Sequence, residues 1–167
     1  NVLPLDQKKK VLLINQLNSI KSPNDSFDHP ALFSEMMEAD WHELVTYETD
    51  FAYNEADEKG VLEFLKENQF DVILCTNFYD RAARPHEYPR QLIAFGLPVM
   101  LITNTPYCIG GKGGLIPEAP TAILNMNLTP AGYRTLKAVL YGQLQPQARW
   151  PLKNYDPFHL LEKAAQE

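Results

Sequence analysis

The chain has 167 residues, of which 45% are hydrophobic and 22% charged, and its formal net charge is −6. This length and composition are typical of one globular domain whose core needs neither disulfides nor metals. The acidic balance and the scattered Lys and Arg argue against a nucleic-acid partner, which requires a basic face. The sequence has no run of 18 apolar residues, so it predicts no membrane-spanning helix.

The first apolar run, residues 11–14, predicts a strand covered on both faces, because its hydrophobic residues are continuous rather than alternating. The polar residues 18–28 predict a loop. A helix is expected to begin at Pro30 with Asp28 as its candidate cap. Its apolar residues recur at helical spacing, namely Leu32, Phe33, Met36 and Met37.

The middle of the chain continues this alternation. Residues 44–47 predict a second strand, and residues 54–68 a second helix with acidic residues near its positive N-terminal end. Residues 71–76 are the clearest buried strand. Residues 87–95 predict a short helix that ends at Gly96, and residues 98–103 predict another buried strand.

The last third contains one more strand and two helices. Residues 122–124 predict a short strand, after which Thr129 caps and Pro130 begins a helix that ends at Gly142. Residues 156–165 predict a final, exposed helix.

These elements predict an α/β fold. Strands that are apolar throughout and alternate with helices indicate a three-layer α/β/α sandwich, flavodoxin-like, with a mostly parallel sheet of about five to six strands. Ligands of such sheets bind beyond the carboxyl ends of the strands. That rule selects residues 15–18, 77–84, 104–114 and 125–127.

The two cysteines show no metal-ligand spacing. We interpret Cys75, inside an apolar run, as a small core residue and Cys108 as an ordinary loop residue. The absence of a disulfide framework favours a reducing compartment such as the cytoplasm. No metal or cofactor is expected.

Five glycine-rich positions, residues 110–114, resemble a phosphate-binding loop at first sight. A nucleotide-binding loop, however, requires Ser or Thr after its Lys and then a helix. Here Gly113 follows Lys112, and the prolines at 117 and 120 oppose a helix. We predict a flexible loop or lid, with Lys112 as a candidate contact for an anionic substituent of a ligand.

A charged cluster follows the strand at residues 71–76, and it has two interpretations. Arg81 and Arg84 are candidates for orienting a substrate, with His86 or Glu87 transferring a proton. Alternatively, the segment is a solvated loop whose ion pairs contribute at most about 1 kcal/mol each. The solvated interpretation is favoured for the cluster as a whole, which also contains Asp80.

Two tyrosines stand in the same kind of position. Tyr79 and Tyr107 each follow a predicted strand within a few residues. Both are candidates for stacking on a sugar ring, and packing against the domain is the equally weighted alternative.

Residues 105–152 carry an ordered series of short motifs. They are Thr105-Pro106-Tyr107-Cys108, Glu118-Ala119-Pro120-Thr121, Thr129-Pro130, Leu140-Tyr141-Gly142 and Pro146-Gln147-Ala148-Arg149-Trp150-Pro151-Leu152. This order and spacing resemble the closing segment of the C-terminal α/β domain of family 3 glycoside hydrolases, particularly the β-N-acetylhexosaminidase branch. Cys108 stands where that family usually has Asp, and Ala148 where it has Gly.

The start of the chain adds to the resemblance. Asn1-Val2-Leu3-Pro4-Leu5 is similar to the phrase that joins this family's barrel to its second domain. We therefore expect residues 1–167 to form a single α/β domain of a larger two-domain hydrolase, with residues 1–10 as the interdomain linker.

The resemblance also bears on catalysis. Retaining hydrolysis needs a carboxylate nucleophile and a proton donor, and the family's nucleophile is an Asp on an N-terminal (β/α)8 barrel. The β-glucosidase branch takes its acid/base Glu from the loop that matches residues 77–84, which has no Glu here before Glu87. The hexosaminidase branch uses a barrel His instead. The resemblance thus implies a domain without catalytic residues, inactive alone, that contacts the barrel and a carbohydrate.

The candidate substrate-binding residues are Tyr79, Arg81, Arg84, Tyr107 and Lys112. One alternative is a stand-alone flavodoxin-like module that binds a small anionic ligand or nucleotide. Another is a purely structural or dimerising domain.

Overall fold

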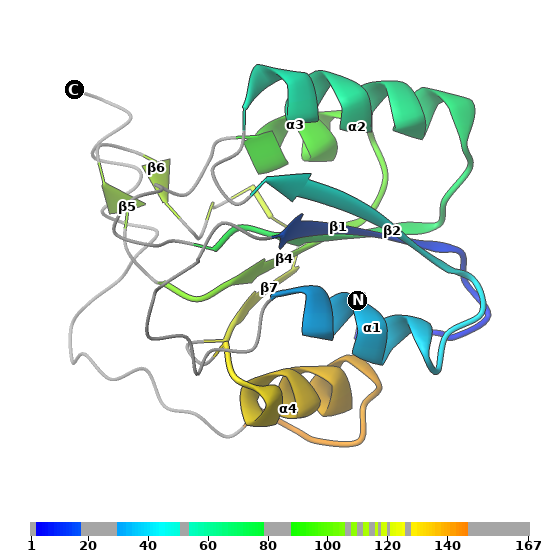
Figure 1. Ribbon diagram of the computed structural model, residues 1–167, viewed down its shortest axis with the longest axis vertical. Helices are drawn as coiled ribbons and strands as arrows, with labels where there is room; N and C mark the ends of the chain where they lie inside the picture. Colours follow the sequence, from blue (N-terminus) through cyan, green and yellow to red (C-terminus); the bar gives the residue numbers. More distant parts are fainter. Residues whose placement is uncertain are drawn as a thin grey trace.

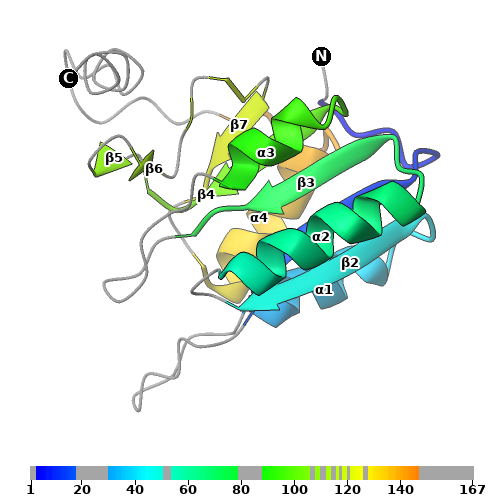
Figure 2. The same ribbon diagram turned by 90° about the horizontal axis from the view of Figure 1, so that it is seen from above.

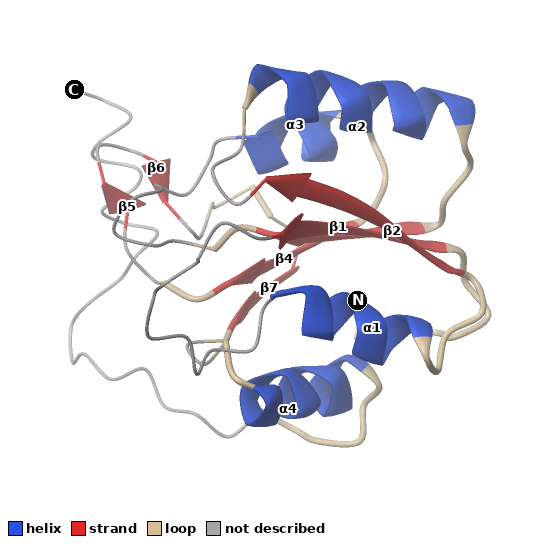
Figure 3. Ribbon diagram, viewed as in Figure 1, coloured by secondary structure: helices blue, strands red, loops and turns tan. Residues whose placement is uncertain are grey.

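Strands and helices alternate along the chain, as the sequence predicts. In the computed structural model, five parallel strands of the described residues form one sheet with helices on both faces (Figure 1). The structure describes residues 3–17, 30–50, 54–78, 88–105, 108–109, 112–113, 116, 118–119, 121–125 and 128–146. The predicted three-layer α/β/α sandwich with a flavodoxin-like parallel sheet is confirmed (Figure 3).

The elements of the described chain have the following bounds. The main sheet contains β1 (Val11–Leu17), β2 (Leu44–Asp50), β3 (Val72–Thr76), β4 (Val99–Thr103) and β7 (Thr121–Leu124). The helices are α1 (Pro30–Glu38), α2 (Glu55–Glu67), α3 (Tyr88–Ala94) and α4 (Pro130–Leu140). A small antiparallel ribbon consists of β5 (Cys108–Ile109) and β6 (Lys112–Gly113).

The strand order is β2-β1-β3-β4-β7. The chain leaves β1 toward β2 on one side and then returns to β3 on the other, so the direction of winding changes between β1 and β3. That place is the topological switch point, where ligands of doubly wound sheets bind. β1 pairs with β2 along its whole length, but with β3 only as far as Ile14 and Cys75.

The predicted buried strands are confirmed. Every residue of β3 and β4 is buried, because helices cover both faces of the sheet and leave no solvated side. The incomplete burial of β7 and β2 is consistent with their positions at the two edges of the sheet.

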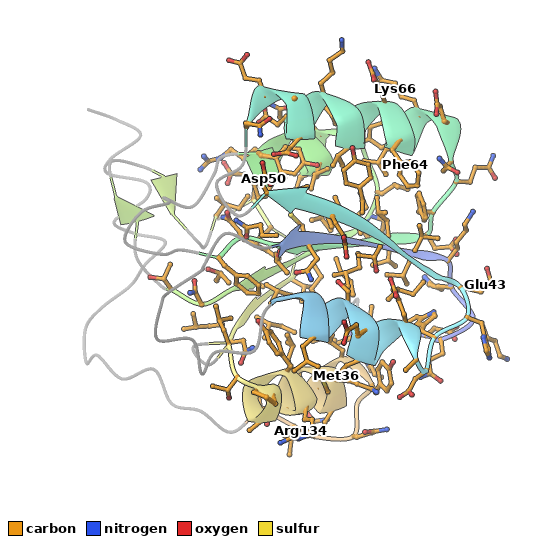
Figure 4. The ribbon with its side chains drawn as sticks, viewed as in Figure 1. Met36, Glu43, Asp50, Phe64, Lys66 and Arg134 are labelled. Atoms are coloured by element: carbon orange, nitrogen blue, oxygen red, sulfur yellow. The ribbon has the colours of Figure 1, made fainter. Side chains whose placement is uncertain are left out.

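The core on the face covered by α1 and α4 contains the largest fully buried aromatic residues of the described chain. Phe33 and Tyr133 stack with ring centroids 5.6 Å apart, and Trp41 meets Tyr141 edge-on at 5.7 Å. Met36 lies near the boundary between α1 and α4 (Figure 4). The predicted apolar stripe of α1 is confirmed, since Phe33 is fully buried.

The opposite face is covered by α2 and α3 (Figure 2). Val61 and Leu65 of α2 and Leu92 of α3 are buried against the sheet. Gly60 lies inside the continuous helix α2. A Cβ added there would lie 2.3 Å from the Tyr47 hydroxyl oxygen. The phenol of β2 therefore occupies the space that any larger side chain at position 60 would need.

The predicted helix ends are also confirmed. Asn54 caps α2 by accepting from the backbone N–H groups of Ala56 and Asp57, at 2.8 and 3.1 Å. Thr129 caps α4. Gly96 and Gly142 follow α3 and α4 with φ of 95° and 71°, a backbone conformation that favours glycine.

The first described residues pack against the domain. Leu5 is buried, and its backbone N–H donates to the Leu140 carbonyl oxygen at 2.8 Å. Pro4 lies against Gly142, where a Cβ would approach the proline ring to 2.8 Å. The predicted role of residues 1–10 as an interdomain linker stays a prediction, and this part of the segment is fixed to the end of α4.

The loop expected at residues 18–28, the Asp28 cap and the helix expected at residues 156–165 lie outside the described residues. The β5–β6 ribbon was not predicted, because each of its strands is two residues long and glycines surround them. No helix in the described part of the chain has the length and hydrophobicity needed to cross a membrane.

Candidate functional site

Buried polar side chains gather where the strands of the main sheet end. Within the described chain they are Asn15, Gln16, Ser34, Thr49, Thr76, Asn77, Thr103 and Thr105. All except Ser34 lie in the last residues of β1, β2, β3 or β4, or directly after them. None of them is charged. This neutral, polar carboxyl end of the sheet is the candidate functional site.

The ends of β1 and β3 are joined through Gln16 and Thr76. The Gln16 backbone N–H donates to Thr76 Oγ1 at 2.9 Å, and the Thr76 hydroxyl donates to the Ile14 carbonyl oxygen at 3.3 Å. The Gln16 side chain reaches Phe78, whose backbone N–H donates to Gln16 Oε1. The chain leaving β3 is thereby held from the side of β1.

The chain leaving β3 is also held from the side of β4. The Thr103 hydroxyl oxygen lies 2.9 Å from the Asn77 carbonyl oxygen and 3.2 Å from the Thr105 carbonyl oxygen. The Asn77 backbone N–H donates to the Ile102 carbonyl oxygen at 2.7 Å. Because a hydroxyl has one hydrogen to donate, the two carbonyls share Thr103. One side chain thus contacts the beginnings of two loops.

Other hydrogen bonds extend this frame to the neighbouring elements. Asn15 Nδ2 donates to Ser34 Oγ at 2.7 Å, which joins the end of β1 to α1. Toward the β7 edge of the sheet, the Asn125 backbone N–H donates to the Thr103 carbonyl oxygen at 2.7 Å. The carboxyl end is therefore connected from α1 to the end of β7.

Four of the five predicted substrate-binding residues are not among the residues that the structure describes. Tyr79, Arg81, Arg84 and Tyr107 fall outside the described residues, as do His86 and Glu87. The described chain stops directly before the first of them, at the fully buried Phe78, and resumes at the buried Tyr88. Likewise it stops at the buried Thr105, two residues before Tyr107. The structure thus brings together the residues that support the two loops.

Lys112 lies in β6, where its backbone pairs with Ile109 of β5. Its side chain is outside the described part of the structure. The ribbon lies past the carboxyl ends of the main strands (Figure 1). The segment predicted as a flexible loop or lid thus contains a short antiparallel pairing at the candidate site.

An ion pair connects α3 to the segment between β6 and β7. Arg90 Nε lies 3.1 Å from Glu118 Oε1, with side chains 32% and 51% exposed. Since solvent screens a pair this exposed, its contribution to stability is at most about 1 kcal/mol.

Cys75 is confirmed as a core residue. It is fully buried in β3, and burial raises the pKa of its thiol. A thiol that is buried and protonated is a poor nucleophile, which is consistent with a packing role for Cys75. Among the described residues, no group of three or more His, Cys, Asp or Glu is placed to hold a metal ion.

The opposite, amino end of the sheet has a different character. A groove of about 700 Å³ there is lined in part by Lys10, Lys66, Phe70, Asp71 and Phe95. The Lys10 ammonium lies 5.1 Å from the centre of the Phe70 ring, and its backbone N–H donates to Asp71 Oδ2. Charged side chains of both signs line this groove, and parallel sheets bind ligands at the other end. We therefore place the candidate site at the carboxyl end.

Sequence reasoning missed the supporting residues of the site. Gln16, Asn77 and Thr105 stand in segments that were selected as ligand-facing, yet their side chains are buried. Thr76 and Thr103 were included in strands without any role. Each of these two threonines is a polar residue at the end of an apolar run, and this pattern could have identified them from the sequence.

Comparison of the chain with protein-family models, with curated proteins and with solved structures finds no match.

Proposed function

We propose that this chain is the non-catalytic C-terminal α/β domain of a glycoside hydrolase of the family 3 β-N-acetylhexosaminidase type. In this role the domain packs against an N-terminal (β/α)8 barrel and forms part of the rim of its sugar site. The barrel and the carbohydrate substrate are the partners, and no cofactor takes part.

One observation supports this proposal above the others, namely the neutral hydrogen-bonded frame at the carboxyl end of the sheet. The frame fixes the beginnings of the loops that follow β3 and β4, through Phe78, Asn77 and Thr105. Those loops contain Tyr79, Arg81, Arg84 and Tyr107, the candidate sugar contacts. Loops that line a sugar site need a rigid support in the fold, because binding groups that are misplaced lose affinity for the ligand.

The charge distribution supports a non-catalytic role. A retaining glycosidase places two carboxyl groups about 5 Å apart across the bond that it breaks. The buried polar residues of the described chain include no Asp or Glu. In the proposal, the nucleophile and the proton donor both come from the barrel.

The test compares the isolated chain with the full-length product of its gene. Both are assayed with the chromogenic substrates 4-nitrophenyl N-acetyl-β-D-glucosaminide and 4-nitrophenyl β-D-glucoside. We expect no turnover by the isolated chain and hydrolysis of the N-acetylglucosaminide by the full-length protein. Turnover by the isolated chain that His86→Ala or Glu87→Gln abolishes contradicts the proposal.

A second candidate is a stand-alone module that binds an anionic ligand or nucleotide. The strand order supports it, because flavodoxin-type sheets bind their ligand at the switch point between β1 and β3. In this chain the Gln16 side chain bridges that place to Phe78. Titration of the isolated chain with FMN or ADP decides between the two, and tight binding that Lys112→Met weakens favours the second candidate.

A further inference from the structure

The side-chain amide of Gln16 makes the same two hydrogen bonds as a backbone peptide group. Its Oε1 accepts from the Phe78 backbone N–H, and its Nε2 donates to the Phe78 carbonyl oxygen at 3.4 Å. The side chain is 1% exposed. The backbone N–H and C=O groups of Phe78, which lies 62 positions later in the chain, are thereby both paired with the Gln16 amide.

The amide stands where two strands separate. β1 and β3 stop pairing after Ile14 and Cys75, while β1 continues beside β2 to Leu17. Beyond Thr76, the chain leaving β3 still follows β4, through the bond from Asn77 N–H to the Ile102 carbonyl oxygen. Phe78 therefore has no neighbouring β1 backbone to pair with. Gln16 supplies the missing peptide group from its side chain.

The position of Phe78 is consequently fixed on two sides. Gln16 holds it from β1, and Thr103 holds the preceding residue, Asn77, from β4. Phe78 itself is fully buried. The next residue is Tyr79, so the loop with the candidate sugar contacts begins at a point that cannot shift without breaking these bonds.

An apolar residue at position 16 would fill the same space without the cost of burying an amide. What the amide adds is direction, because a paired donor and acceptor define one position and one orientation of Phe78. The hydrogen-bond partners described for Gln16 are the uncharged groups of Thr76 and Phe78.

We propose that Gln16 is a positioning residue for substrate: its amide fixes Phe78, the residue directly before the segment that carries the predicted sugar contacts Tyr79 and Arg81. The proposal rests on the proposed function, in which the loop after β3 forms part of the sugar site. Gln16 acts through Phe78 and does not touch the carbohydrate.

The first test follows amide exchange in the 167-residue chain by NMR. Gln16→Met keeps the volume and removes both hydrogen bonds, so the protection factor of the Phe78 amide should fall about tenfold. Ser34→Ala is the matched control, since it removes the equally buried bond to Asn15 without touching Phe78. An unchanged Phe78 protection factor in a folded Gln16→Met variant refutes the inference.

Gln16→Glu provides a second, pH-dependent test. Burial and the facing Phe78 carbonyl oxygen should raise the pKa of the new carboxyl group above its ordinary value. Its protonated form has a donor and an acceptor, as the amide does, whereas the carboxylate has no donor. The Phe78 protection factor should therefore be low at pH 8 and recover as the pH falls toward 5. Equal protection at both pH values contradicts the proposed contact.

The last test uses the full-length protein and 4-nitrophenyl N-acetyl-β-D-glucosaminide. Gln16→Met should raise KM about tenfold with little change in kcat, because misplaced contacts weaken binding while the barrel's chemistry is intact. Thr135→Val, at an exposed position of α4 outside the candidate site, should leave KM unchanged. A loss of Phe78 protection without a change in KM refutes the positioning role. An inactive wild-type protein refutes the proposed function instead, and the exchange results still decide whether Gln16 holds Phe78.

Discussion

The middle of the sheet and its carboxyl end are both buried, but their chemistry differs. In the middle, β3 and β4 present only apolar side chains from Val72 to Leu74 and from Val99 to Ile102. At the carboxyl end, Gln16, Thr76 and Thr103 are buried to the same extent and are hydrogen-bonded. Figure 4 helps to locate the two ends, since Asp50 marks the carboxyl end of β2 and Glu43 lies at its amino end.

This difference separates two tasks. Apolar burial is strong and non-directional, so the middle of the sheet stabilises the fold without defining the exact path of a loop. Hydrogen bonds contribute less net free energy but define positions. We therefore expect substitutions in the middle to lower stability most. Substitutions at the carboxyl end should lower it less and alter the loops.

The largest expected effect is in the middle. Leu74 is fully buried in β3, and Leu74→Ala should lower the free energy of unfolding by about 3 kcal/mol, within the usual range of buried Leu→Ala substitutions. Urea denaturation followed by circular dichroism measures the loss. Leu144→Ala, at a position 42% exposed, is the control and should change it by less than about 0.5 kcal/mol. Similar losses for both variants contradict the proposal that the middle of the sheet carries most of the stability.

An intermediate effect is expected at the carboxyl end. Thr103→Val keeps the shape but leaves the Asn77 and Thr105 carbonyls without their shared donor, at a cost of about 1–3 kcal/mol. Its distinguishing sign is faster exchange of the Thr105 amide, which donates to Thr103 Oγ1 at 3.3 Å. Thr135→Val removes a hydroxyl from an exposed position of α4 and should have little effect. If Thr103→Val leaves the Thr105 amide unchanged, the carboxyl end does not position this loop.

Cys75 lies at the boundary between the two regions, and burial raises the pKa of its thiol. The folded state keeps the proton that the unfolded chain releases at alkaline pH. Stability from this group is therefore complete below the ordinary thiol pKa and is lost as the pH rises toward the folded value. Between pH 7 and 9.5 the loss should be about 1 kcal/mol.

The measurement compares urea midpoints of Cys108→Ser and Cys108→Ser/Cys75→Ala across this pH range. The tyrosines and lysines titrate in both variants, so only the difference in slope reports Cys75. Equal slopes show that the thiol titrates alike in the folded and unfolded chains.

The smallest effect is expected at the exposed ion pair between Arg90 and Glu118. Glu118→Gln removes the half-exposed partner of Arg90 and should lower stability by less than about 1 kcal/mol, with the effect disappearing at 1 M salt. Lys59→Gln, which removes the exposed pair with Glu63, is the comparison. A clearly larger loss for Glu118→Gln indicates that this pair fixes the segment before β7.

Local patterns allowed much of the fold to be predicted. The continuous apolar run at residues 71–76 identified β3, and Thr129 and Gly96 identified the ends of helices, because these signals act within a few residues. The parallel direction of the strands was predicted from their continuous apolar residues, which indicate a sheet covered on both faces. These predictions needed no knowledge of which strand lies beside which.

The candidate site was less predictable, because its bonds join distant parts of the chain. Gln16 and Phe78 meet only because β3 returns to the side of β1 opposite β2. The same rule that selected residues 15–18 as ligand-facing could not show that Gln16 turns inward. A polar residue that ends a strand looks the same in sequence whether it faces a ligand or supports a loop.

The position of β1 between β2 and β3 also affects how the domain folds. Val11 pairs with Leu44 on one side and with Val72 on the other, so the first strand of this sheet must wait for two later segments. Pairings between such remote residues form slowly, and the unpaired strand meanwhile presents an apolar, hydrogen-bonding surface to other chains. During synthesis, β1 is thus without its sheet partners until both later segments have been made.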